Sequence, residues 1–215
     1  MSEPITNPAW LGELAGRLDP LETSWGPPVG QGIRRSAVIA LLSRAPEPDL
    51  VLTARSTGLA HHAGQISMPG GGREPGDASP ADTALREMEE EIGLRRAGVE
   101  TLGQLVPRTV GVSRNRVVPI VGVWSGDEPI CAADTGEVAA VLRWPLAELA
   151  DPAHRVTARH PGRPTSSPAW QMGDWFLWGF TAWVVDALLQ AGGWEREWDT
   201  GRLVDIPKAF RGNWA

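Results

Sequence analysis

The sequence predicts a single domain of mixed α/β class. Short apolar runs typical of strands recur along the chain, and two longer segments with a helical spacing of apolar residues lie between and after them. The 215 residues include 25 glycines and 19 prolines. This share indicates many turns but stays below the roughly 25–30% that marks low-complexity chains. The length is sufficient to bury a sizeable core.

The first half of the chain begins with a short helix and continues with paired strands. Asn7-Pro8 precedes apolar residues at helical spacing, which predicts an amphipathic helix with an Asn cap and Pro at its first position. Pro20 to Gly32 then interrupts the pattern. Apolar runs flank a proline-containing turn and predict a hairpin of strands over residues 37–42 and 50–52.

Two helices and several further strands are expected after this hairpin. The first helix spans Pro80–Ile92, because Ser79 and Asp82 have the form of a capping box and Gly93 is a suitable stop. Its apolar positions recur every three or four residues, so one face is committed to the core. The second spans Phe180–Ala191, and its buried face is expected to comprise Trp183, Val184, Ala187 and Leu188. Further strands are expected over residues 103–106, 117–123 and 138–144, with a hairpin over 170–178.

The remaining segments are expected to be irregular. Pro161–Pro168 has the composition of an exposed loop, and the chain from Asp199 onward that of a loosely structured tail. We therefore expect a helix and linker over residues 1–32 that pack on the domain, the domain itself over 33–191, and a C-terminal tail over 192–215.

Composition and charge exclude several classes of function. The formal net charge is −6 and no long basic run occurs, so nucleic acid is not expected as a partner. An anionic small molecule remains open if a divalent cation lies between it and the protein. The single cysteine, Cys131, excludes an intramolecular disulfide and a multi-thiolate zinc site, and we expect it to be buried. No signal peptide or membrane-spanning run is apparent, so a cytoplasmic protein without a membrane partner is expected.

A cluster of carboxylates on the first helix carries the main functional signal. Glu87, Glu90 and Glu91 share one side of the helix at i, i+3 and i+4, whereas Glu89 points away. Like charges at this spacing repel by a few tenths of a kcal/mol per pair, so they need a cation or a solvated surface. A solvated acidic face is the alternative interpretation. The adjacent Arg86 and the preceding glycines 70–72 favour an anion-binding metal site, and hard oxygen ligands favour Mg²⁺ or Mn²⁺ over zinc.

These residues resemble the Nudix box, G-x5-E-x7-R-E-U-x-E-E-x-G-U with U aliphatic. The second half of the box is matched in full by Arg86, Glu87, Met88, Glu90, Glu91, Gly93 and Leu94. The first half has one inserted residue, and Asp77 takes the place of the single Glu that precedes R-E in the motif. That Glu is a structural partner in the family. The resemblance implies a Nudix α/β/α sandwich with a mixed sheet between helices.

A second motif resembles the coenzyme A pyrophosphatase subgroup of this family. Residues 52–65 follow its L-T-x-R-S-x-x-L-x-x-H-x-G-Q signature, and the box insertion and the Asp are also typical of it. Ala60 stands where a basic residue is common. The segment Ser113-Arg114-Asn115 lacks the Ser-Gly-aromatic turn of the subgroup, which leaves acyl or nucleotide preference open.

The resemblance implies Mg²⁺-dependent hydrolysis of the diphosphate bond of coenzyme A (CoA) or acyl-CoA, giving 4′-phosphopantetheine and adenosine 3′,5′-bisphosphate. Glu87, Glu90 and Glu91 would hold the metal, and Arg86 would orient a glutamate or meet the diphosphate. Glu90 is the first candidate for the base and Glu137 the second. The substrate-binding residues implied are Arg55, Ser56, His62, Gln65, Gly70 and Gly71.

Several points stay open at this stage. Another diphosphate such as ADP-ribose, NADH or a nucleoside triphosphate is an alternative substrate, although the four-cysteine zinc module common in NADH-cleaving relatives is absent from the sequence. A non-catalytic nucleotide-binding module is a further alternative. The family resemblance also implies a homodimer. Arg114 and Arg116 are candidates for the 3′-phosphate of CoA. Two interpretations are open for Trp175, Trp178 and Trp183, which could pack in the core or stack on the adenine of a substrate.

Overall fold

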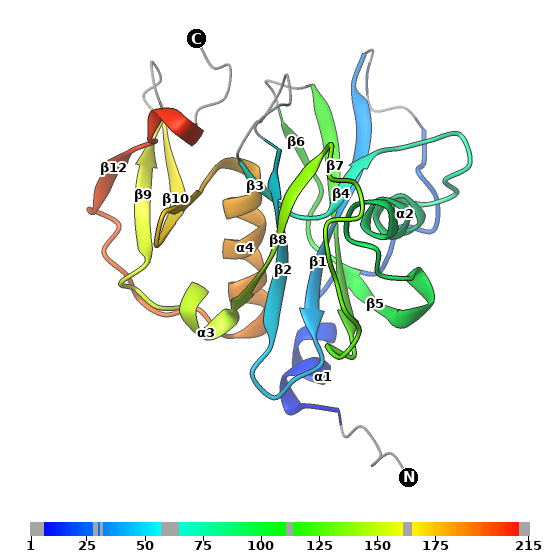
Figure 1. Cartoon of the computed structure of the whole chain (residues 1–215), viewed down its shortest axis with the longest axis horizontal. Helices are drawn as coiled ribbons and strands as arrows, with labels where there is room; N and C mark the ends of the chain where they lie inside the picture. Colours follow the sequence, from blue (N-terminus) through cyan, green and yellow to red (C-terminus); the bar gives the residue numbers. More distant parts are fainter. Residues whose placement is uncertain are drawn as a thin grey trace.

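The computed structural model describes residues 7–27, 30, 32–56, 65–110, 114–160 and 165–210. In chain order (Figure 1), the elements are α1 (Ala9–Ala15), β1 (Arg34–Ser43), β2 (Asp49–Arg55), β3 (Ile66–Ser67), β4 (Gly70–Gly72), α2 (Pro80–Ile92), the 3₁₀ turn η1 (Arg96–Gly98), β5 (Val99–Gln104), β6 (Arg108–Val110), β7 (Asn115–Trp124), β8 (Val138–Pro145), α3 (Leu146–Leu149), β9 (Arg155–Arg159), β10 (Ser166–Met172), β11 (Trp175–Leu177), α4 (Gly179–Gly192), β12 (Leu203–Asp205) and η2 (Lys208–Phe210). Among these described residues, no helix is long and apolar enough to cross a membrane.

A mixed sheet forms the centre of the domain. Its strand order is β3-β2-β1-β7-β5, with β4 also paired to β1, β6 to β7 and β8 to β2. The hairpin of β1 and β2 is antiparallel, as the turn between them predicts. β1 and β7 run parallel over ten residue pairs, from Arg34 opposite Asn115 to Ser43 opposite Trp124. This long ladder forms the centre of the sheet, and β2 and β4 both pair with β1.

Helices cover both faces of this sheet, so the predicted α/β/α sandwich is confirmed. Ala37, Ile39 and Leu41 of β1 belong to the apolar cluster beneath α2, whereas Ala40 and Leu42 belong to the cluster beneath α4 and α1. Figure 1 shows α2 on one side of β1 and α4 on the other. A strand covered on both faces is apolar without alternation, which explains the continuous apolar run in this part of the sequence.

A smaller sheet of order β11-β10-β9-β12 packs beside α4. The Arg155 side chain is fully buried, forms an ion pair with Asp186 of α4, and lies over the rings of Trp170 and Trp198 at 4.7 and 4.4 Å. A buried guanidinium needs such partners because burial removes the water that would otherwise solvate its charge. This arrangement gives two of the eleven tryptophans a structural role.

The structure corrects the expectation of an irregular C-terminal region. Residues from Asp199 onward include β12, which pairs with β9 in parallel, and η2. Ser166–Pro168, expected in an exposed loop, begin β10 and pair with β9. Short strands of this kind form only when a partner is present, which local sequence does not show. The division into 1–32, 33–191 and 192–215 stays a prediction, although Leu11 and Leu14 of α1 are buried in the main core.

Four further expectations were wrong in detail. Pro8, not Asn7, is the N-cap of α1, and it makes no side-chain cap bond. Cys131 is exposed. The first of the later strands, β5, spans 99–104 rather than 103–106, and Val106 is exposed. In α4 the buried face is rotated about the helix axis from the expected one. Val185 and Leu189 are fully buried, whereas Trp183 and Ala187 are only partly buried. This helix is apolar nearly all round, so spacing alone does not define its inner face.

Candidate active site

The carboxylate helix α2 forms as its sequence predicts. The Ser79 hydroxyl accepts from the Asp82 amide, the Asp82 carboxylate accepts from the Ser79 amide, and Gly93 ends the helix in the left-handed conformation at φ 72°. Met88 and Ile92 are buried against the sheet. The helix therefore holds its glutamates at a fixed rotation beside β4.

Glycines in β4 permit close contact with these glutamates. A Cβ at Gly71 would lie 2.5 Å from the carboxyl carbon of Glu87, and one at Gly70 would overlap the backbone of Ala37 and Val38. The Gly70 amide instead donates to Glu91 Oε2 at 3.1 Å. Gly71 is thus required by its contact with the Glu87 carboxylate, and Gly70 by its contact with the backbone of β1.

Arg86 donates hydrogen bonds to four groups around the helix. Its Nη1 donates to Glu90 at 2.9 Å, and its Nη2 donates to the Gly72 carbonyl at 2.9 Å and to Glu87 at 3.1 Å. Nε and Nη2 contact the two oxygens of Asp77 at 3.2 and 3.1 Å. The hydrogen bond with Asp77 is the main cause that raises the pKa of Arg86. Of the two roles open for Arg86, this geometry supports orientation of the glutamates.

Asp77 has the structural role expected of it. The side chain is buried, and Oδ2 accepts from Thr83 Oγ1 and from the Glu74 amide, both at 2.8 Å. Burial alone would raise the pKa of Asp77, but the hydrogen bonds from Arg86, Glu74 and Thr83 outweigh it and lower the pKa overall. The substitution of Asp for Glu in the box therefore preserves the partner of Arg86.

Glu91 is the most strongly perturbed carboxylate. Its pKa is raised to about 7, chiefly by burial and to a smaller extent by the neighbouring Glu87 and Glu137, while the hydrogen bond from the Gly70 amide and the charge of Arg55 lower it. Arg55 Nη1 lies 3.8 Å from Glu91, and Arg55 Nη2 lies 3.7 Å from Glu137. Burial also raises the pKa of Glu87. Ionised carboxylates in this setting are destabilised unless a cation joins them.

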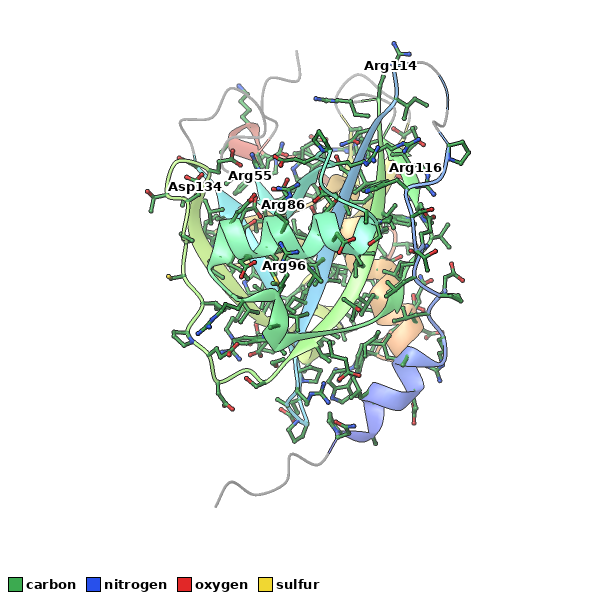
Figure 2. The ribbon with its side chains drawn as sticks, turned by 90° about the vertical axis from the view of Figure 1, so that its right-hand side faces the viewer. Arg55, Arg86, Arg96, Arg114, Arg116 and Asp134 are labelled. Atoms are coloured by element: carbon green, nitrogen blue, oxygen red, sulfur yellow. The ribbon has the colours of Figure 1, made fainter. Side chains whose placement is uncertain are left out.

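Glu137 is placed near Arg55 and Glu91 by a turn over residues 134–137, which was not predicted from the sequence. Asp134 Oδ1 accepts from the Gly136 amide at 2.8 Å and from the Glu137 amide at 3.3 Å. The neighbouring Ala133 amide donates to the Glu91 carbonyl at 2.9 Å, which ties the turn to the end of α2. An Asp two residues before a Gly is a turn signal, and it was the available clue to this loop. Figure 2 shows Asp134 and Arg55 at the same end of α2.

Comparison with known proteins identifies the family. A model of the NUDIX domain matches residues 33–163. The chain is 37% identical over 171 residues to Uncharacterized Nudix hydrolase NudL of Escherichia coli K12, which covers 74% of this chain and 83% of that protein. The chain belongs to the Nudix family. It is accordingly a hydrolase of the pyrophosphatase type.

Two solved structures resemble the chain at lower identity. A Nudix hydrolase from M. smegmatis, RenU, is 17% identical with a TM-score of 0.47 over 62% of this chain and 83% of its own. A MutT/nudix family protein from Enterococcus faecalis is 18% identical with a TM-score of 0.47 over 78% of this chain and 70% of its own.

Nudix hydrolases generally use divalent metal ions such as Mg²⁺, and the residues present fit such an ion. The donors are carboxylate oxygens, which Mg²⁺ prefers, and Glu91 is buried with a raised pKa that a cation would offset. As they stand, no three acidic, histidine or cysteine side chains of the described residues converge on one point. Glu87 and Glu90 instead both form ion pairs with Arg86. The ligand set Glu87, Glu90 and Glu91 stays a prediction.

The candidate substrate residues of this Nudix chain divide into three groups. Arg55, Gly70 and Gly71 lie at the carboxylates, as described. The Ser56 amide donates to the Glu137 carbonyl at 2.8 Å, and the Gln65 carbonyl accepts from the Arg55 amide at 2.9 Å. His62 lies outside the described residues.

Side chains further from the carboxylates are also placed by the structure. Gln65 Nε2 and Trp178 Nε1 both donate to the Phe210 carbonyl, at 2.9 and 3.0 Å. Trp175 and Trp183 pack partly buried against the main core, which supports the core interpretation for these two. Arg116 Nη2 lies 2.8 Å from Glu22, and Arg114 occupies a left-handed turn at φ 48°.

Proposed function

We propose that this chain hydrolyses the diphosphate bond of CoA or acyl-CoA with Mg²⁺ or Mn²⁺, giving 4′-phosphopantetheine and adenosine 3′,5′-bisphosphate. One observation carries the proposal. Arg55, from the CoA-type signature, lies 3.8 Å from Glu91 of the box helix and 3.7 Å from Glu137. Two motifs that are separate in sequence thus lie next to each other, which supports a shared site. A guanidinium in this position suits recognition of a diphosphate oxygen once the carboxylates are paired with a cation.

The chain's own residues have distinct tasks in this reaction. Glu87, Glu90 and Glu91 would hold the cation, which when bound neutralises diphosphate oxygens and lowers the pKa of water. Arg86 positions Glu87 and Glu90 and is itself fixed by the buried Asp77. Arg55 lies close to Glu91 and Glu137, and its Nε is buried without a hydrogen-bond partner among the described residues.

Two carboxylates remain candidates for the base that accepts a proton from water. Glu90 is exposed and held by Arg86, and Glu137 is exposed and held by Arg55. Replacement of each by Gln separates them. If Glu137 is the base, Glu137→Gln is expected to lose kcat by two to four orders of magnitude and to keep its affinity for the metal. The variant of a metal ligand is expected to need more Mg²⁺ as well.

The proposal is tested with a panel of CoA, acetyl-CoA, ADP-ribose, NADH and dGTP, incubated with Mg²⁺ and resolved by chromatography. Cleavage of CoA or acetyl-CoA to the two phosphate esters is the expected result. Hydrolysis of ADP-ribose, NADH or dGTP without hydrolysis of CoA would overturn the CoA assignment and leave the family activity intact. No turnover of any substrate would favour a non-catalytic nucleotide-binding module.

The homodimer and the cytoplasmic location also stand as proposals. Light scattering of the purified chain tests the first, because a mass of twice 23.1 kDa is expected for a dimer. Fractionation of cells that express the chain tests the second.

A further inference from the structure

Three arginines lie side by side on adjacent strands near the candidate active site. Arg35 of β1 is opposite Arg116 of β7 in the parallel ladder. Arg73 follows β4, and its amide donates to the Arg35 carbonyl at 2.9 Å, which continues the pairing of Gly71 with Ala37. Side chains alternate between the faces of a sheet, so residues two apart share a face. Ala37 packs beneath α2, and the register therefore assigns all three arginines to the α2 face.

This arginine row, defined as Arg35, Arg73 and Arg116, has an unbalanced charge. Like charges directly across strands repel one another. Arg116 is paired with Glu22 at 2.8 Å, but no carboxylate of the described residues lies within 4.0 Å of a guanidinium nitrogen of Arg35 or Arg73. Moreover, Arg35 Nη2 is buried and has no hydrogen-bond partner within the described part of the chain. The guanidinium charges of Arg35 and Arg73 and the unsatisfied Nη2 donor of Arg35 are therefore suited to bind an anionic hydrogen-bond acceptor.

The position of the row relates it to the diphosphate. Gly71, two residues before Arg73, packs on the carboxylate of Glu87. Two residues of extended chain advance by about 7 Å, so the row begins roughly that far from the proposed metal ligands. Figure 2 shows Arg55 and Arg116 on opposite sides of Arg86. A substrate whose diphosphate lies at the glutamates would have one end toward Arg55 and the other toward the arginine row.

We propose that the arginine row is a subsite for a phosphate monoester, namely the 3′-phosphate at the adenosine end of a CoA-type substrate. This inference rests on the proposed function. A phosphate monoester carries about −1.5 to −2 charges at pH 7, which matches the two unbalanced guanidinium charges. The 3′-phosphate is separated from the diphosphate by only a few ribose bonds, in keeping with the short distance along β4. Guanidinium groups bind phosphate through paired N–H donors, and Arg35 has such a donor unsatisfied.

Kinetics on a matched pair of substrates tests this subsite. CoA and 3′-dephospho-CoA differ only in the phosphate concerned. Arg73→Gln, at an exposed position, and Arg35→Gln are each expected to raise KM for CoA about tenfold or more and to change KM for 3′-dephospho-CoA less than twofold. Arg34→Gln is the control, because it removes the same charge one residue away, on the opposite face of β1. Equal effects on both substrates, or no effect on either, would overturn the subsite.

A binding measurement separates failure of the subsite from failure of the proposed function. Calorimetry compares adenosine 3′,5′-bisphosphate with adenosine 5′-monophosphate and needs no turnover. The subsite requires that the bisphosphate bind at least about tenfold more tightly, and that Arg73→Gln abolish this preference. If the wild-type protein cleaves neither CoA substrate, the proposed function fails, yet the calorimetric preference still decides the subsite. Equal binding of the two nucleotides would refute it.

Discussion

Replacement of Glu91 by Gln is expected to stabilise the metal-free protein at alkaline pH. Burial raises the pKa of Glu91 from 4.5 to about 7. Between these values the native state binds more protons than the unfolded state, so stability falls as the pH rises through this window. One pKa unit corresponds to 1.36 kcal/mol, and the ionised side chain thus costs about 3 kcal/mol above pH 7. Glutamine has no proton to lose and keeps the acceptor for the Gly70 amide.

Thermal unfolding in EDTA measures this effect. For a domain of this size about 3 kcal/mol corresponds to roughly 6–12 °C in Tm. Glu91→Gln is expected to melt several degrees above the wild type at pH 8 and close to it at pH 5. The loss of one partner of Arg55 reduces the gain, but Glu137 stays within 3.7 Å of that guanidinium.

Addition of Mg²⁺ is expected to reverse the order. The wild type gains stability by binding the ion, while Glu91→Gln gains little and loses activity by orders of magnitude. Glu89→Gln is the matched control, since Glu89 is on the same helix but pairs with Arg96 away from the cluster. A Glu91→Gln protein that is no more stable than the wild type in EDTA at pH 8 would refute the account of Glu91 as a buried, unfavourably ionised carboxylate.

Two further predictions concern the groups around Glu91. Arg86→Gln leaves the buried Asp77 carboxylate without its cation and is expected to lower the free energy of unfolding by about 3–5 kcal/mol, measured by chemical denaturation. The additional change Asp77→Asn is expected to restore part of this stability. An additive loss in the double variant would contradict the pairing of the two residues. Gly71→Ala places a methyl group 2.5 Å from the Glu87 carboxyl carbon and is expected to weaken Mg²⁺ binding in calorimetry at least tenfold, whereas Gly72→Ala, with no atom within 4 Å of the new methyl, is the control. Equal Mg²⁺ affinity in the two alanine variants would show that Gly71 is not needed for close packing.

The sequence predicted the parts of the site that depend on one helix. The capping box, the apolar stripe and Gly93 are local signals, and α2 has the predicted bounds Pro80–Ile92. A structural role for Asp77 was also expected from the motif, but its ion pair with Arg86 became apparent only in the structure.

Features that depend on distant partners were predicted less well. β12 has three residues, and two of them are exposed, so its composition does not distinguish a strand from a tail. It forms because β9, more than forty residues earlier, offers a free edge. The arginine row also depends on the register of three strands, which apolar patterns do not fix at the polar end of a sheet.

The parallel ladder of β1 and β7 has a consequence for biosynthesis. Arg34 meets Asn115, so the central pair cannot form until both strands have left the ribosome. Until then β1 presents apolar side chains on both faces without its main partner. Closing so long a loop is slow, and unpaired apolar strands aggregate. We expect fragments that end before Trp124 to be insoluble, and expression to benefit from chaperones or slow induction, because the nascent chain depends on a strand that is made late.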